Sequence, residues 1–241
     1  MNVLIVYAHP EPTSFTGAMK NAAARALRAA GHQVVVSDLY AEGFDPVGGR
    51  SDFKTTADAA RFHYQNEQNH AAKNDSFADD VAREQARLLD ADLMIFLFPI
   101  WWGGLPAILK GWFDRVFAYG VAYADGKRFD QGLFRGRRGL MGLVTGGTTE
   151  RYAADGVYGE MDVVLHSVKR GILEYIGLDV LPPFVAYAAP RVDADERARY
   201  LTAWEQRVLD AAGDPAWQAK VRALGPVARV VDSGTGWTQK R

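Results

Sequence analysis

The 241-residue sequence contains no cysteine. This absence excludes disulfide bonds, zinc–thiolate and iron–sulfur sites, and any catalysis or redox switching by a thiol. Histidines are few, at positions 9, 32, 63, 70 and 166, and no two have the His-x-x-x-His spacing typical of a helical metal site. Redox chemistry would therefore need an organic cofactor or a metal with nitrogen and oxygen ligands. The spacing of the histidines makes a catalytic metal site the less favoured of the two.

The sequence also lacks an excess of charge and a long apolar run. Its 28 Lys and Arg against 29 Asp and Glu give a formal net charge of -1, which argues against a nucleic-acid partner. The longest apolar run, residues 93–102, has about half the length that a transmembrane span needs. The N-terminal apolar run follows no basic region, unlike a signal peptide. We expect a cytoplasmic protein with no transmembrane segment.

Short apolar runs alternate with amphipathic segments. The runs predict strands at 3–6, 33–37, 93–98, 140–145 and 180–187, and the segments predict helices at 14–30, 76–89, 106–119, 158–176 and 193–212. Pro182 and Pro183 place the last strand at an edge. The pattern predicts an α/β fold with a doubly wound, five-stranded parallel sheet, as one domain over residues 1–241.

Three segments depart from this regular alternation. Residues 39–74 form an insertion after the second strand, and an irregular tail at 213–241 follows a core that ends near residue 212. The helix at 106–119 carries more apolar side chains than one face of a surface helix needs. We therefore expect that helix to pack partly against another subunit.

Ligands of such folds bind outside the carboxyl ends of the strands, so the loops after strands one, three and four are candidate sites. The first, AHPEPTSFTG, lacks the G-x-G-x-x-G spacing of a dinucleotide turn. Thr13, Ser14 and Thr16 bring hydroxyls to the start of a helix, and His9 could add a donor. These residues predict either an ordinary helix cap or a phosphate site.

The second and third loops add aromatic rings and glycines. In PIWWGGLPA we favour a ligand contact for Trp102, whereas Trp101 could face the ligand or cover the edge of the core. In TGGTTERY, Gly146 and Gly147 predict accessible N–H groups beside Tyr152, or else a simple glycine turn. Together the three loops suit a flavin, with its phosphate on the first loop and its ring against the other two.

The same loops resemble the NAD(P)H:quinone oxidoreductases, a flavodoxin-like family often called DT-diaphorases, and their bacterial relatives. The matching stretches lie between residues 2 and 210 and are AHPEPTSFTGAMK, VVVSDLYAEGFDPV, FPIWWGGLPAILKGWFDRVFAYGVAY, TGGTTERY with VYGEMDVVL, and the helix around DADERARYL. The run PAILKGWFDRVF is the most specific of them. The insertion also matches the family.

The resemblance implies FAD rather than FMN, NAD(P)H as co-substrate, two-electron reduction of quinones, and a homodimer with active sites at the subunit interface. With the hydroxyls of the first loop, the expected cofactor residues are His9, Thr13, Ser14, Phe15, Thr16, Pro99, Ile100, Trp101, Trp102, Gly103, Thr145, Gly146, Gly147, Tyr152 and Arg197. The expected substrate pocket comprises Trp102, Gly103, Tyr123, Asp125, Tyr152 and Tyr158, with Tyr123 reaching the pocket of the other subunit. Tyr152 and Tyr158 are the expected catalytic residues.

The sequence departs from the family at three of these positions. Tyr158 stands where better-known members have a histidine, and a phenol can donate a hydrogen bond but cannot become cationic. We expect Tyr158 to donate to Tyr152 or to a flavin oxygen. Gly103 replaces an aromatic residue and Asp125 replaces a tyrosine, which predicts a wider or more polar pocket.

The resulting hypothesis is a one-site shuttle, in which NAD(P)H and then the quinone occupy the same place over the flavin. An alternative is a flavin-binding ancillary subunit that regulates a potassium-efflux transporter. An electron-carrier flavodoxin fits less well, because such carriers are strongly acidic and this chain is nearly neutral.

Overall fold

A computed structural model describes residues 1–230 of the chain. Its sheet has the order β2-β1-β3-β4-β5, with β6 also paired to β4, and every pair is parallel. The strands are β1 (Asn2–Tyr7), β2 (Gln33–Asp38), β3 (Leu93–Pro99), β4 (Arg138–Val144), β5 (Asp179–Val180) and β6 (Phe184–Ala186). The predicted doubly wound sheet is confirmed. It has six segments instead of five, because Pro182 and Pro183 interrupt the edge strand.

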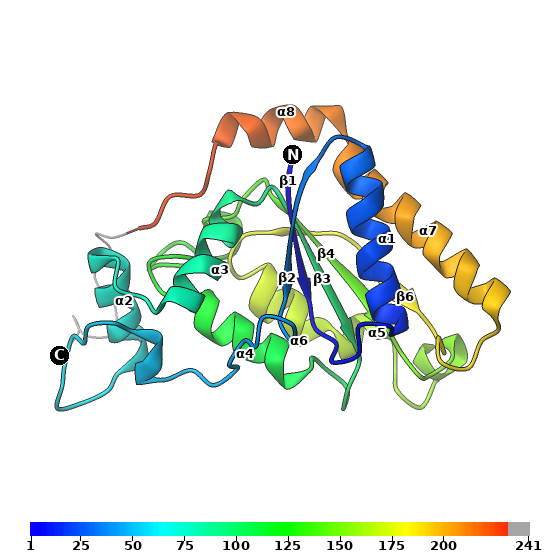
Figure 1. The fold of residues 1–241 in the computed structure, drawn as a ribbon, viewed down its shortest axis with the longest axis horizontal. Coiled ribbons are helices and arrows are strands. Elements are labelled where there is room, and N and C mark those ends of the chain that lie inside the picture. Colours follow the sequence, from blue (N-terminus) through cyan, green and yellow to red (C-terminus); the bar gives the residue numbers. More distant parts are fainter. Residues whose placement is uncertain (231–241) are drawn as a thin grey trace.

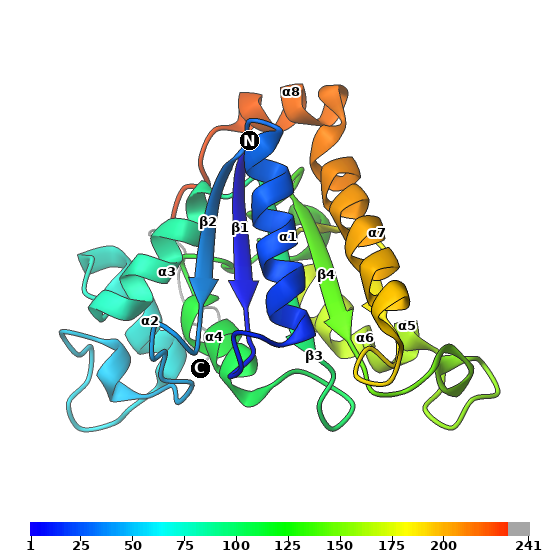
Figure 2. The same ribbon diagram turned by 45° about the vertical axis from the view of Figure 1, so that its right-hand side comes forward.

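Helices cover both faces of the sheet (Figures 1 and 2). On one face lie α1 (Phe15–Ala29) and α7 (Ala194–Gly213). Helix α8 (Pro215–Leu224) lies across the end of the strands and adds Trp217 and Val221 to the same apolar cluster. The other face packs against α3 (Asp79–Asp90), α4 (Ala107–Val116), α5 (Met161–Val164), α6 (His166–Val168) and the π-helical turn η4 (Lys169–Leu173). The insertion contributes α2 (Tyr64–Asn74) and the 3-10 turn η1 (Arg50–Asp52), and two further 3-10 turns are η2 (Phe129–Gln131) and η3 (Thr149–Tyr152).

Several expectations about the helices are wrong. The helix expected at 106–119 ends at Val116. The helix expected at 76–89 begins at Asp79, because Phe77 forms an antiparallel bridge with Phe53 of the insertion. The helix expected at 158–176 begins at Met161 and is broken, because Gly159 has a φ of 71° and η4 is π-helical. The tail expected to be irregular contains α8, which Asp214 caps by accepting from the N–H groups of Ala216 and Trp217. Residues 231–241 of that tail lie outside the described part of the chain.

The insertion packs on α4 through a buried ion pair. The Arg115 Nε donates to Asp52 Oδ1 at 2.8 Å, and its Nη1 donates to the Asp45 carbonyl at 2.6 Å. Gly111 lets the chain approach closely, because a Cβ there would lie 2.1 Å from the Pro46 carbonyl oxygen. Most of the apolar side chains of α4 are buried within the chain. The many apolar side chains of this helix are therefore accounted for by packing within the chain. They do not by themselves indicate contact with another subunit, which corrects the inference drawn from the sequence.

Among residues 1–230, none of the helices has both the length and the apolar character needed to cross a bilayer.

Glu67 of α2 holds residues 56–58, in the middle of the insertion. Only 1% of Glu67 is exposed. Its carboxylate accepts from the N–H groups of Ala57 and Asp58, at 2.7 and 3.2 Å, and from the Thr56 hydroxyl at 3.1 Å. Burial acts to raise the pKa of Glu67, but the hydrogen bonds outweigh burial and hold the pKa below its ordinary value.

Replacing Glu67 with Gln should therefore destabilise the protein at neutral pH. The amide would present a donor where the carboxylate accepts, at a cost of about 1–3 kcal/mol in the free energy of unfolding. Because the folded pKa is the lower one, the carboxylate stabilises the fold above the unfolded pKa and loses this effect as the pH falls. Urea unfolding from pH 7 to pH 4 should show the gap between wild type and E67Q narrowing with acid. A constant gap would contradict this role.

Candidate active site

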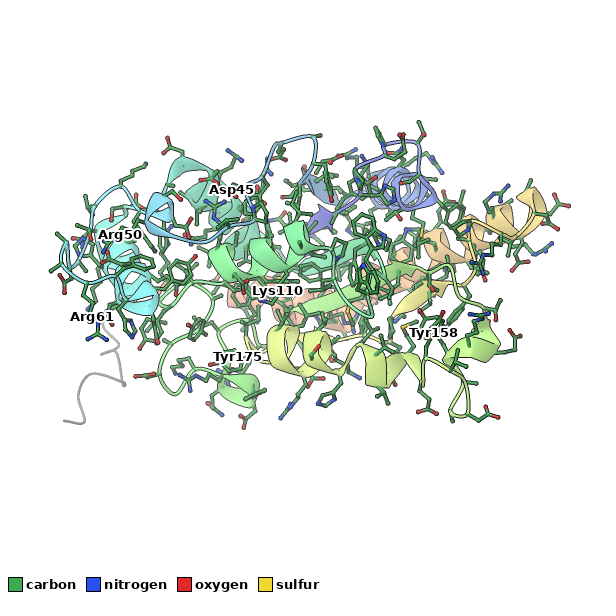
Figure 3. All side chains as sticks on the ribbon, turned by 90° about the horizontal axis from the view of Figure 1, so that it is seen from below. Asp45, Arg50, Arg61, Lys110, Tyr158 and Tyr175 are labelled. Carbon is green, nitrogen blue, oxygen red and sulfur yellow. The ribbon has the colours of Figure 1, made fainter. Side chains whose placement is uncertain are left out.

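The loops that follow β1, β3 and β4 meet at one edge of the sheet. Strands β1 and β3 pair from Val3–Leu93 to Tyr7–Leu97, and β3 pairs with β4 from Leu93–Arg138 to Pro99–Val144. Two adjoining cavities of about 570 and 560 Å³ lie among these loops and share Ile100, Thr145 and Gly146. We call the two together the loop groove. Figure 3 views the molecule from this end, with Tyr158 far from Asp45, Arg50 and Arg61 of the insertion.

The larger cavity of the loop groove gathers most of the predicted cofactor residues. Its wall consists of His9, Thr13, Ser14, Phe15, Thr16, Ala18, Pro99, Ile100, Trp101, Val144, Thr145, Gly146, Ala189, Pro190 and Arg197. The first loop, the second loop and the distant Arg197 of α7 thus come together as predicted. The Arg197 guanidinium donates to the Val192 carbonyl just before that helix.

The first loop forms both a helix cap and a set of free donors. The Ser14 hydroxyl accepts from the Gly17 N–H at 3.0 Å, so Ser14 is the N-cap of α1. The Thr13 hydroxyl donates to Glu11 Oε1 at 2.6 Å and is therefore already engaged. Within residues 1–230, the N–H groups of Phe15 and Thr16 have no hydrogen-bond partner. These two groups, at the positive end of the helix dipole, suit an anion.

A tight turn presents both tryptophans of the second loop to solvent. The N–H and carbonyl groups of Trp101 and Gly104 bond to each other at 3.1 and 3.0 Å, and both central residues have a positive φ, 50° at Trp102 and 71° at Gly103. Trp101 is 40% exposed and Trp102 is fully exposed. Neither indole covers the core, so the structural alternative for Trp101 is wrong. Trp101 lines the larger cavity of the loop groove. Trp102 and Gly103 line the smaller one, which we call the second cavity.

Thr145 links the third loop into one hydrogen-bonded chain. Its Oγ1 accepts from the Gly147 N–H at 2.9 Å and donates to the Tyr152 hydroxyl at 3.1 Å. Because Tyr152 accepts in this bond, its own phenol proton remains available to a ligand. The Gly146 N–H has no partner among the described residues, whereas that of Gly147 is already used. The expectation that both glycines offer a free N–H is thus correct only for Gly146.

Tyr158 lies beside Tyr152 but bonds to a different side chain. The two ring centroids are 5.1 Å apart, and Arg151 Nη1 donates to the Tyr158 hydroxyl at 3.2 Å. The structure therefore does not show the expected hydrogen bond from Tyr158 to Tyr152. Both tyrosines line the second cavity with Ile100, Trp102, Gly103, Thr145, Gly146, Gly147, Arg151, Val164 and Arg191.

Comparison with known proteins agrees with the arrangement of these loops. The family model described as a flavodoxin-like fold matches residues 1–208. The chain is 42% identical to rat NAD(P)H dehydrogenase [quinone] 1 over 206 residues, 85% of this chain and 75% of the relative. It is 41% identical to human ribosyldihydronicotinamide dehydrogenase [quinone] over 207 residues, 86% and 90% of the two chains.

Solved structures show the same relationship. A candidate quinone reductase from Klebsiella pneumoniae superposes with a TM-score of 0.83 and 39% identity, covering 88% of this chain and 85% of that one. An NAD(P)H:quinone oxidoreductase from Methanothermobacter marburgensis gives a TM-score of 0.65 and 27% identity, with coverage of 86% and 95%. The chain belongs to the NAD(P)H:quinone oxidoreductase family.

Two residues expected from this family lie elsewhere in the fold. Tyr123 lines a separate cavity of about 690 Å³ with Tyr64, Phe113 and Phe117, and burial raises the pKa of its phenol to about 12. Asp125 pairs with Arg128 at 3.3 Å. Neither residue contributes to the loop groove of its own chain.

Sequence reasoning also missed several residues of the loop groove. Arg151 and Arg191 bring positive charge to the second cavity, and neither forms an ion pair with a described carboxylate. Arg151 was predictable, because it lies next to Tyr152 in the TERY motif. Arg191, Ala189 and Pro190 follow β6, a strand end that carries no recognisable motif. Their position in the loop groove follows from the parallel pairing of β6 with β4, which no sequence motif indicates.

The two glycines of the third loop should respond differently to an added methyl group. A Cβ at Gly147 would lie 2.8 Å from the Tyr152 ring and 3.1 Å from the Tyr158 ring, whereas a Cβ at Gly146 would meet no atom within 4 Å. In ligand-free protein, G147A should therefore lower the free energy of unfolding by about 1–3 kcal/mol. G146A is the matched control and should leave it unchanged in thermal unfolding. Equal melting temperatures for the two variants would contradict the packing described here.

Proposed function

We propose that this protein reduces quinones with electrons from NAD(P)H, using FAD bound in the loop groove. The observation that carries the proposal is the convergence, in one groove, of free N–H donors at the start of α1, two exposed indoles and a glycine loop. Relatives named as quinone dehydrogenases support the reaction. The absence of cysteine agrees with chemistry that an organic cofactor supplies.

The residues of the loop groove fit a flavin nucleotide. The unpartnered N–H groups of Phe15 and Thr16 would hold its phosphates, with Arg197 at the same cavity. Trp101 and Trp102 offer flat apolar surface to a planar ring, and the open space at Gly146 allows close approach of that ring to the backbone. The two joined cavities favour FAD over the shorter FMN, since a dinucleotide can extend through both.

When bound, the flavin would supply hydride transfer, which no side chain of this protein can perform. The protein itself positions the ligands and stabilises negative charge. The Gly146 N–H and the Tyr152 hydroxyl are preorganised donors for an oxygen that gains charge. Arg151 and Arg191 add positive charge at the second cavity, which suits the diphosphate of a nicotinamide nucleotide.

A homodimer would complete this site. Tyr123 and Asp125 lie outside the loop groove of their own chain. They can therefore contribute to a substrate pocket only from a second copy, as the family resemblance implies. Gly103 leaves the wall of the second cavity open, which favours bulky acceptors.

Tyr152→Phe should separate catalysis from binding. Loss of the hydroxyl removes one hydrogen bond to a charged group, so kcat should fall about tenfold, for roughly 1.5 kcal/mol, with little change in flavin affinity. Tyr187→Phe is the matched control, because its ring lies 5.8 Å from Tyr152 and the residue does not line the loop groove. Steady-state NADH oxidation with menadione measures both. An unchanged kcat in Y152F, or an equal loss in Y187F, would exclude this role for the phenol.

Kinetics and the chromophore test the proposal as a whole. The purified protein should be yellow, and mass spectrometry of the released chromophore should give FAD. Because a one-site shuttle places NADH and then the quinone at the same position over the flavin, double-reciprocal plots at several menadione concentrations should be parallel. Intersecting lines would rule out a shared place for NADH and quinone. A colourless protein that takes up no added FAD would defeat the proposal itself.

A further inference from the structure

Another cavity, separate from those described above, lies at the opposite end of the sheet from the loop groove. It has a volume of about 680 Å³ and lies between the start of β4, helix α8 and the segment that follows this helix. Arg137 in its wall immediately precedes β4, whereas Thr145 of the loop groove immediately follows β4. The two sites are therefore separated by the length of that strand, roughly 23 Å. Figure 1 shows α8 across this end of the strands. We call this hollow the α8 cavity.

The wall of the α8 cavity is basic. It contains Lys127, Arg135, Arg137, Lys220 and Arg229, and it contains no Asp or Glu. Arg229 pairs with Asp75 at 2.9 Å, but within residues 1–230 the other four cations have no carboxylate partner. Asp130, Glu174 and Asp179 line a neighbouring hollow, which shares Arg135 and Gly136 with the α8 cavity. Four cations without an ion-pair partner around one cavity favour an anionic ligand.

One of these cations, Arg137, is buried instead of solvated. It is 3% exposed, its Nη2 donates to the Gly225 carbonyl, and its Nε has no hydrogen-bond partner. Burial lowers the pKa of Arg137 against a weaker opposing effect of Asp92, whose carboxylate accepts from the Asn2 N–H at 2.8 Å. Asp92 acts on Arg137 only at a distance, and no described carboxylate forms an ion pair with it. A buried guanidinium without a direct ion-pair partner is costly, so an anion in the cavity would relieve part of that cost.

The rest of the wall is apolar. Leu133, Leu224, Pro226, Val227 and Val230 complete the lining. Leu224 is 54% exposed although it is a large aliphatic side chain at the end of α8. A purely inorganic anion would leave this apolar surface in water, whereas a ligand with a hydrocarbon body would cover it.

We propose that the α8 cavity binds a small organophosphate, with its phosphate among the four cations and its apolar body against Leu224 and Val227. A phosphate dianion satisfies several cations at once through charge-assisted hydrogen bonds. The site is separate from the loop groove and does not depend on the proposed flavin chemistry.

Isothermal titration calorimetry of the full chain with octyl phosphate tests the proposal directly. The protein is titrated as purified, and the charge reversals described next separate the α8 cavity from the donors at the start of α1. Octyl phosphate below its micellar concentration should bind at one site, about tenfold tighter than inorganic phosphate, and octanol should not bind measurably. Equal affinities for octyl phosphate and inorganic phosphate, or no heat with either, would overturn the assignment.

A pair of charge reversals on α8 locates the binding. Lys220 lines the cavity and is exposed, so K220E should fold normally and weaken octyl phosphate binding about fivefold or more. Arg222 lies on the same helix but outside the lining, so R222E makes the same change in net charge and should alter affinity less than about twofold. Equal losses in both variants would show an unspecific charge effect and contradict the site.

Vesicles of phosphatidic acid distinguish a free ligand from a lipid head group. Wild-type protein should not sediment with these vesicles under conditions in which octyl phosphate binds. Sedimentation that K220E abolishes and R222E does not would assign the cavity to a membrane surface and overturn the small-molecule proposal.

Discussion

Parallel hydrogen bonding among β1, β3 and β4 is the constraint on which the loop groove depends. These strands are in continuous register, and the Ile100 N–H extends the ladder by donating to the Val144 carbonyl at 2.9 Å. All three chains therefore leave the sheet at one edge and turn into loops that share a cavity. A slip of one residue would turn every side chain of a strand to the other face of the sheet. The apolar cores on both faces oppose such a slip and so fix where the loops begin.

The loops provide hydrogen-bond donors that are not used within the fold. Phe15, Thr16 and Gly146 retain free N–H groups within the described chain, and Tyr152 retains a proton because Thr145 donates to it. Other polar groups of the same loops are used internally, as at Ser14, Thr13 and Gly147. In the proposed function, these free groups are the donors that would receive an anionic, planar cofactor.

The sequence predicted the elements that repeat a simple pattern and missed those set by tertiary contacts. Apolar runs located the central strands, and Pro182 and Pro183 placed the edge correctly. The polar helix α2 carries no apolar stripe, and its buried Glu67 binds residues 56–58, a contact that no motif indicates. The start of α3 depends on the Phe53–Phe77 bridge. Arg191 joins the groove through the pairing of β6, and the bond from Arg151 to Tyr158 depends on a loop conformation that no motif specifies.

Backbone amide hydrogen exchange with and without FAD tests the central claim most directly. If the loop groove holds the cofactor, FAD should slow exchange at Phe15, Thr16 and Gly146, the donors that have no partner in the described chain. Exchange in α8, at the far end of the sheet, should not change. Unchanged exchange at those three amides, or protection confined to another part of the molecule, would contradict the account.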